Sequence, residues 1–122
     1  MDAYRVGLEF VGWFHLLPGG SELSSRRFRQ IDKAATSLVL NVAEGNGRCL
    51  QSDRQTFLDT AESATVKAAA YLELSQRTGE VNLSQLQAGM ALLDRVAGLV
   101  HGLADFTRNS TISRSQSEID KV

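Results

Sequence analysis

The sequence predicts an all-α protein, built as an up-down-up-down four-helix bundle. Apolar residues recur along most of the chain at spacings of three and four, which is typical of helices with one buried face. The glycines cluster between these periodic segments, and Pro18 is the only proline. Short connections place each helix antiparallel to its neighbour in sequence. With 122 residues, the chain has room for one domain with its own core, and we expect residues 1–107 to form it.

The first two helices are bounded by proline, glycine and serine. The first helix is predicted over about Asp2–Leu17, where Pro18-Gly19-Gly20 stops it. Ser21 or Ser24 then caps a second helix, because a serine hydroxyl can accept a hydrogen bond from a free backbone amide of the first turn. This helix continues to about Glu44-Gly45, where the glycine provides the left-handed conformation of a helix C-terminus.

Two further helices and a tail complete the chain. Ser52-Asp53-Arg54-Gln55 has the form of a capping box, so a third helix is predicted from there to about Arg77, with Gly79 closing it. Asn82 or Ser84 caps a fourth helix that ends near residue 108. Residues 108–122 lack aromatic side chains and helical periodicity, and cannot bury enough surface to offset the cost of ordering. We therefore expect them to form a disordered tail.

Two of the predicted helices are apolar on more than one side. A helix that faces a single core needs an apolar stripe of only about 100°, and the second and fourth helices exceed it. Either such a helix lies in the middle of its own domain or another subunit covers its back face, and the short chain favours the second alternative. The predicted homo-oligomer interface consists of Val39, Leu40 and Ala43 in the second helix, or Leu92, Leu99 and Phe106 in the fourth.

Composition limits the range of functions. The formal net charge of −1 gives no bulk attraction to nucleic acid or to an anionic membrane, so any such binding requires a local patch. Cys49 is the only cysteine, which excludes a disulfide within the chain and suits a reducing compartment. No secretory signal is recognisable, and no apolar tract approaches the ~20 residues that span a bilayer. We expect a cytoplasmic protein without a membrane partner.

One run of residues resembles a known family. The run Asn41-Val42-Ala43-Glu44-Gly45-Asn46-Gly47-Arg48 is its most specific part, and residues 30–38 and 57–63 extend the likeness. Together they resemble the four-helix bundle family of proteins encoded in intervening sequences of ribosomal RNA genes. The resemblance implies assembly as a homopentamer. It also implies kinship with accessory variability determinants of retroelements, which are thought to bind nucleic acid beside a reverse transcriptase.

The polar residues of this run are interpreted first as a structural motif. Asn41 should be a buried asparagine that fixes the register of packed helices, with a ligand contact as the alternative. Glu44 and Arg48 should stabilise the turn that Gly45 and Gly47 form, by hydrogen bonds to backbone groups at the helix end. The alternative is that the turn holds Arg48 toward a phosphate.

A local excess of basic residues predicts a nucleic-acid contact. Residues 24–54 contain six basic residues against three acidic ones, and a ring of subunits would multiply this excess into a positive belt. Because Arg26, Arg29 and Lys33 are expected to point in different directions, an ordinary solvated face is the alternative. The candidate phosphate-binding residues are Arg26, Arg27, Arg29, Lys33, Arg48 and Arg54.

No catalytic or metal-binding set is recognisable. His15 and His101 are isolated among apolar neighbours and are expected to pack, and Cys49 has no histidine nearby in sequence. We predict no cofactor, no metal and no catalytic residue. The leading hypothesis is a non-enzymatic homo-oligomer that binds RNA or DNA, and the rival is a protein-binding scaffold or adaptor. An enzyme is the third hypothesis, and it would have to rely on Glu44, Arg48 and the two histidines.

Overall fold

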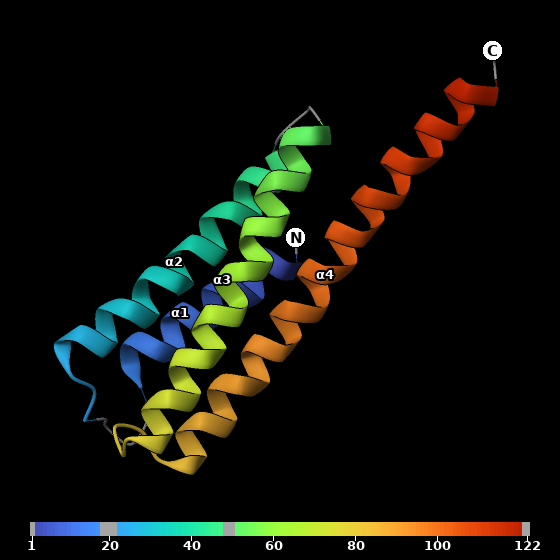
Figure 1. The fold of residues 1–122 in the computed structure, drawn as a ribbon. Coiled ribbons are helices and arrows are strands. Elements are labelled where there is room, and N and C mark those ends of the chain that lie inside the picture. The colour runs from blue at the N-terminus through green and yellow to red at the C-terminus, as the bar shows by residue number, and fades with distance from the viewer. Residues whose placement is uncertain (1, 18–21, 48–50, 121–122) are drawn as a thin grey trace.

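The described residues of the computed structural model are 2–17, 22–47 and 51–120, and they form an antiparallel four-helix bundle (Figure 1). The helices are α1 (Asp2–Leu16), α2 (Ser25–Gly47), α3 (Gln51–Arg77) and α4 (Leu83–Asp120). No strand occurs within these ranges, so the all-α prediction is confirmed. Each helix packs against its neighbours in sequence, and α1 also packs against α4. Within the same residues, no helix is long and apolar enough to cross a bilayer.

The core lies between the four apolar stripes that the sequence displays. Its side chains come from every helix, and the largest of them are completely enclosed. The alanines of α2 and α3 let these two helices approach closely, and this pair forms the most extensive helix contact in the bundle. The fully buried large side chains include Phe10 and Phe14 of α1, Ile31 and Leu38 of α2, Leu58 and Leu72 of α3, and Leu93 and Val100 of α4.

Side chains cap two of the helices as the sequence predicts. The backbone amide of Arg27 donates to Ser24 Oγ at 3.1 Å, so Ser24 caps α2. At the start of α4, the amide of Gln85 donates to Asn82 Oδ1 and the amide of Asn82 donates to Gln85 Oε1, both at 2.8 Å. This reciprocal pair is a capping box, and it settles the choice between Asn82 and Ser84. Helix α3 begins at Gln51, one residue before the predicted cap.

Glycine ends α3 as predicted but does not end α2. Gly79 has a φ of +78°, and no other described residue has a positive φ. The prediction that Gly45 adopts the left-handed conformation is therefore wrong, because α2 continues in helical geometry to Gly47. Gly45 is needed for a different reason: a Cβ atom there would lie 3.1 Å from both Cγ and Cδ2 of Leu58. The absence of a side chain lets α2 and α3 converge at this end.

The fourth helix is longer than predicted. It continues to Asp120 instead of ending near residue 108. No glycine or proline follows Gly102, and nothing in the sequence therefore interrupts the backbone hydrogen bonds of α4. Figure 1 shows this last part of α4 projecting beyond the ends of α2 and α3.

One carboxylate joins the two connections at the other end of the bundle. Glu80, in the turn between α3 and α4, accepts hydrogen bonds from Thr78 Oγ1 at 2.7 Å, the amide of Ser24 at 3.2 Å and Arg27 Nε at 3.4 Å. The backbone adds the bond from the amide of Glu22 to the carbonyl of Glu80. Hydrogen bonds hold the pKa of Glu80 below its usual value. The bond from the Thr78 hydroxyl has the largest effect, and the bond from the Ser24 amide has the next largest. We call this set of contacts the Glu80 clasp.

Candidate anion-binding groove between α2 and α3

Three of the predicted basic residues lie together on α2. Arg26, Arg29 and Lys33 are all exposed. Their spacing of three and then four residues places them along one side of a regular helix. The expectation that they point in different directions is therefore wrong, since positions seven apart differ by only about 20° around a helix. They form a cationic row on the outside of α2.

The other three predicted basic residues do not extend this row. Arg27 is half-buried, pairs with Glu80 in the clasp, and lies with its Cζ atom 5.9 Å from the centre of the Tyr71 ring. Arg54 is also half-buried, and its Nε atom is enclosed without a hydrogen-bond partner among the described residues. Arg48 lies outside the described residues. Arg27 therefore belongs to the bundle's own packing, and Arg54 is not exposed alongside the row.

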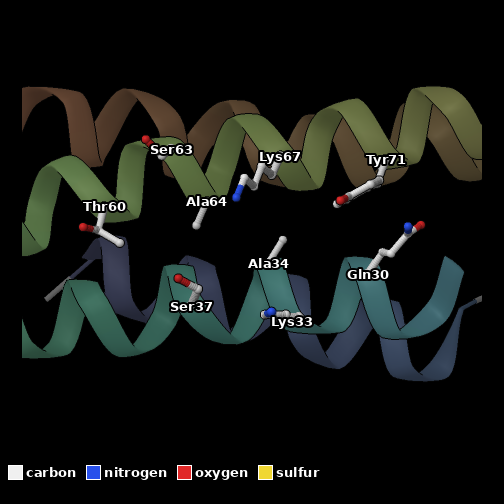
Figure 2. Close-up of a pocket in the computed structure, with 9 residues that line it drawn as sticks. All are labelled: Gln30, Lys33, Ala34, Ser37, Thr60, Ser63, Ala64, Lys67 and Tyr71. Atoms are coloured by element: carbon white, nitrogen blue, oxygen red, sulfur yellow. The ribbon is translucent and has the colours of Figure 1, made fainter. Parts of the chain in front are cut away.

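A groove runs beside the cationic row, along the contact between α2 and α3 (Figure 2). It has a volume of about 320 Å³. Its floor is formed by Ala34 and Ala64, whose small side chains let the two helices lie close together. The walls are polar: α2 provides Gln30, Lys33 and Ser37, and α3 provides Thr60, Ser63, Lys67 and Tyr71. Figure 2 shows Lys67 reaching from α3 into the space between the helices.

The groove is positively charged. Lys33 and Lys67, one on each wall, are the only charged residues among the described ones that line it, and both are exposed. Lysine carries a compact, fully charged ammonium with three donors, so two lysines on opposite walls attract an anion between them. Two hydroxyls of the walls already have partners: Ser37 Oγ accepts from Asn41 Nδ2 at 3.2 Å, and Thr60 Oγ1 donates to the carbonyl of Thr56 at 2.9 Å. The two ammonium groups therefore dominate the chemistry of this groove.

Lys67 is not among the predicted basic residues because it lies outside the basic segment of residues 24–54. A signal for it exists in the sequence. Thr60, Ser63, Lys67 and Tyr71 follow one another at spacings of three and four, which places four polar or amphipathic residues along one line of α3. Ala64 lies beside this line, facing the second helix. A polar line next to a stripe of alanines marks the edge of a helix contact.

The polar residues of the run 41–48 contribute differently from the prediction. Asn41 is half-buried, and its Nδ2 atom donates to the carbonyl of Ser37 at 2.8 Å, one turn earlier in the same helix. These contacts lie within α2, so they do not set the register between helices as expected. Glu44 is exposed in the last turns of α2, and Gly45 and Gly47 are helical. Residues 45–47 therefore belong to α2 and do not form the expected turn, and Arg48 lies outside the described residues.

The predicted interface residues divide into covered and exposed ones. Val39 is only 8% exposed and packs in the position that faces Gly7 of α1, so the single chain already covers it and its prediction as a subunit contact is wrong. Leu92 is half-buried against the core. Leu40, Ala43, Leu99 and Phe106 are exposed, with Leu40 at 59% and Phe106 at 66%.

The two histidines have carboxylate neighbours instead of purely apolar ones. His15 Nε2 lies 2.7 Å from Asp32 Oδ1, and the His15 ring also meets the edge of Phe14 and Phe28. His101 Nδ1 lies 3.8 Å from Glu62 Oε1. Within the described ranges, no group of three or more histidine, cysteine, aspartate or glutamate residues is placed to hold a metal ion.

Comparison with known proteins supports the fold. No family model and no curated protein matches the chain. A solved structure from Bacteroides thetaiotaomicron, a protein of unknown function from the S23 ribosomal protein family, superposes with a TM-score of 0.73. The match covers 84% of this chain and 97% of that one, at 19% sequence identity. At this identity the likeness shows that the two proteins share a helical fold, and the resemblance to the intervening-sequence family stays a prediction.

Proposed function

We propose that this protein is a non-enzymatic bundle that binds the phosphate backbone of RNA or DNA across α2 and α3. The observation that carries the proposal is the groove that Lys33 of α2 and Lys67 of α3 line together, with no carboxylate among its described lining residues. Arg26 and Arg29 continue the same cationic side along α2. A helix rises about 1.5 Å per residue, so Arg26 and Lys33 lie roughly 10 Å apart along α2. A cationic surface of this length can contact successive phosphates of one strand.

The proposal predicts binding with a steep dependence on salt. Fluorescence anisotropy with labelled single-stranded RNA, structured RNA and duplex DNA should show weakly selective binding that falls sharply between about 50 and 200 mM salt. Replacing Lys33 and Lys67 together with glutamine should weaken binding and reduce the slope of log Kd against log salt by about 1 to 2, because fewer counterions are released.

The matched control removes two cations from another side of the bundle. Arg5 and Arg95 are exposed and pair with Asp2 and Glu9 on the α1 and α4 side. The variant with Arg5→Gln and Arg95→Gln has the same net charge as the lysine variant, but it should retain the salt slope of the unmodified protein. Equal slopes in all three proteins, or no association at tens of micromolar protein and low salt, would contradict the proposal. The protein-binding adaptor would then become the leading hypothesis.

We also propose that the protein binds as a homo-oligomer, assembled through the exposed apolar side of α4. Leu92, Leu99 and Phe106 follow at intervals of seven, and the last two are exposed. Assembly there leaves the groove between α2 and α3 accessible.

Light scattering at micromolar concentration should give a multiple of the 13.3 kDa chain mass. The family resemblance implies that this multiple is five. Phe106→Glu should reduce that mass, since it places a charge in the interface. Leu16→Glu, at a site on α1 that is 85% exposed, should leave the oligomer mass unchanged. A monomeric unmodified protein would refute the assembly.

A further inference from the structure

A second groove lies between α3 and α4, on a different side of α3 from the lysines. It has a volume of about 510 Å³. Part of its lining is apolar and includes Val66, Ala69 and Ala97, and we call this apolar part the floor. Val66 is 68% exposed even though it lies in this apolar floor. Isolated exposed apolar residues are common on proteins, but one that continues into a groove lined by further apolar groups indicates a contact surface.

The rim of this groove is acidic. Glu62 and Glu73 of α3 and Asp94 of α4 line it, and no lysine or arginine does. Glu73 and Asp94 form no ion pair with any described residue. Glu62 Oε1 is enclosed without a hydrogen-bond donor among those residues, since His101 Nδ1 at 3.8 Å is too distant to donate to it. Among the described residues, Glu73 and Asp94 on opposite walls therefore have no cationic partner, and Glu62 has only His101 nearby.

We propose that this groove binds an amphipathic helix of a partner protein, one whose narrow apolar stripe is flanked by lysine or arginine. The alanine floor allows the backbone of a docked helix to approach closely, while the stripe covers Val66. Long basic side chains can then extend to the carboxylates on either rim. Glu62 and Glu73 are eleven positions apart, which corresponds to roughly 16 Å along α3 and about three turns of a docked helix.

The charge and composition of the groove favour this occupant over the others. A nucleic acid is repelled by three carboxylates. A second copy of this chain would have to offer its cationic side, the exposed side of α2, and the only large apolar side chain exposed there is Leu40. One leucine covers the floor poorly. Because the two grooves are lined by different sides of α3, a basic helix and a nucleic acid can bind at the same time, and helix binding does not require nucleic-acid binding.

The experiment uses the full chain and two synthetic peptides. The first peptide is an amphipathic helix of about four turns built from leucine and lysine, with the leucines at spacings of three and four. The second has glutamate in place of every lysine. Anisotropy of the labelled peptides should show saturable binding of the lysine peptide and none of the glutamate peptide. Glu73→Lys combined with Asp94→Lys should weaken binding of the lysine peptide by about tenfold or more, and should create binding of the glutamate peptide.

A matched variant separates the groove from general electrostatics. Glu9→Lys combined with Glu22→Lys changes the net charge by the same amount on exposed sites away from the groove, and should retain the affinity for the lysine peptide within about twofold. Val66→Ser, a neutral change on the floor, should weaken binding without changing its salt dependence. Equal affinity of all variants for the lysine peptide would overturn the proposal. So would a fall in the oligomer mass of the Glu73→Lys and Asp94→Lys protein, because a second copy would then occupy the groove.

Discussion

Replacing Phe14 with alanine should lower the free energy of unfolding by about 3–5 kcal/mol. Phe14 is fully buried, and its ring stacks on Phe28 at 4.8 Å and on Phe10 at 6.3 Å between centroids. The contact with Phe28 joins α1 to α2, whereas Phe10 belongs to α1 itself. Because α1 is the shortest helix, with 15 residues, it has few other large contacts that could compensate for a cavity at this position. Urea denaturation monitored by circular dichroism measures the loss.

Leu16 provides the control in the same helix. Its side chain is almost completely exposed, so Leu16→Ala should change the free energy of unfolding by no more than about 0.5 kcal/mol. If Phe14→Ala costs no more than Leu16→Ala, then α1 is not packed on the bundle through Phe14. The slope of the unfolding free energy against urea concentration (the m value) should stay unchanged while the midpoint falls. This would show that stability is lost without a change in the surface exposed on unfolding.

Replacing Gly89 with alanine should destabilise the bundle by about 1–3 kcal/mol, whereas the same change at Gly98 should stabilise it by up to about 1 kcal/mol. Both glycines lie in α4. A Cβ atom on Gly89 would come within 2.6 Å of Trp13 Cη2 and 2.9 Å of Leu72 Cδ1, so the indole or the helix must shift. A Cβ atom on Gly98 would meet nothing within 4 Å, and alanine favours the helix there.

Thermal melting of the two variants tests this pair. At this chain length, 1 kcal/mol corresponds to roughly 3–6 °C in Tm, so the variants should differ clearly and in opposite directions from the unmodified protein. A Gly89→Ala protein that melts at or above the unmodified temperature would show that α1 and α4 are not in close contact at Trp13.

The elements of this fold could be predicted because their signals are local. The spacing of apolar residues depends on one helix at a time, and a cap such as Ser24 or Asn82 depends on three or four neighbouring residues. The end of α3 could be predicted in the same way, because Gly79 is itself a local signal for a helix end. Gly45 shows where local reasoning fails: its sequence context is that of a helix C-terminus, but its role depends on Leu58 in the next helix. Near residue 108 of α4, no glycine or proline marks a helix end, and the helix continues to Asp120.

The candidate groove could be predicted only in part for a related reason. Arg26, Arg29 and Lys33 are visible as a basic segment, but Lys67 joins Lys33 only because α2 and α3 lie side by side. Val39 is the reverse case: it was predicted to contact another subunit, but α1 of the same chain covers it. Its position on the back of α2 gave no indication of this. Both cases depend on which neighbouring helix covers which side, and a single sequence without its fold does not contain that information directly.

The Glu80 clasp has a consequence for the order in which the bundle comes apart. It joins residues 56 positions apart and closes the open end of the hairpin that α2 and α3 form, where α1 ends and α4 begins. When the clasp breaks, both connections at this end lose their shared hydrogen bonds in the same event. We therefore expect hydrogen exchange to report the two connections opening as one local unit, although more than fifty residues separate them in the chain.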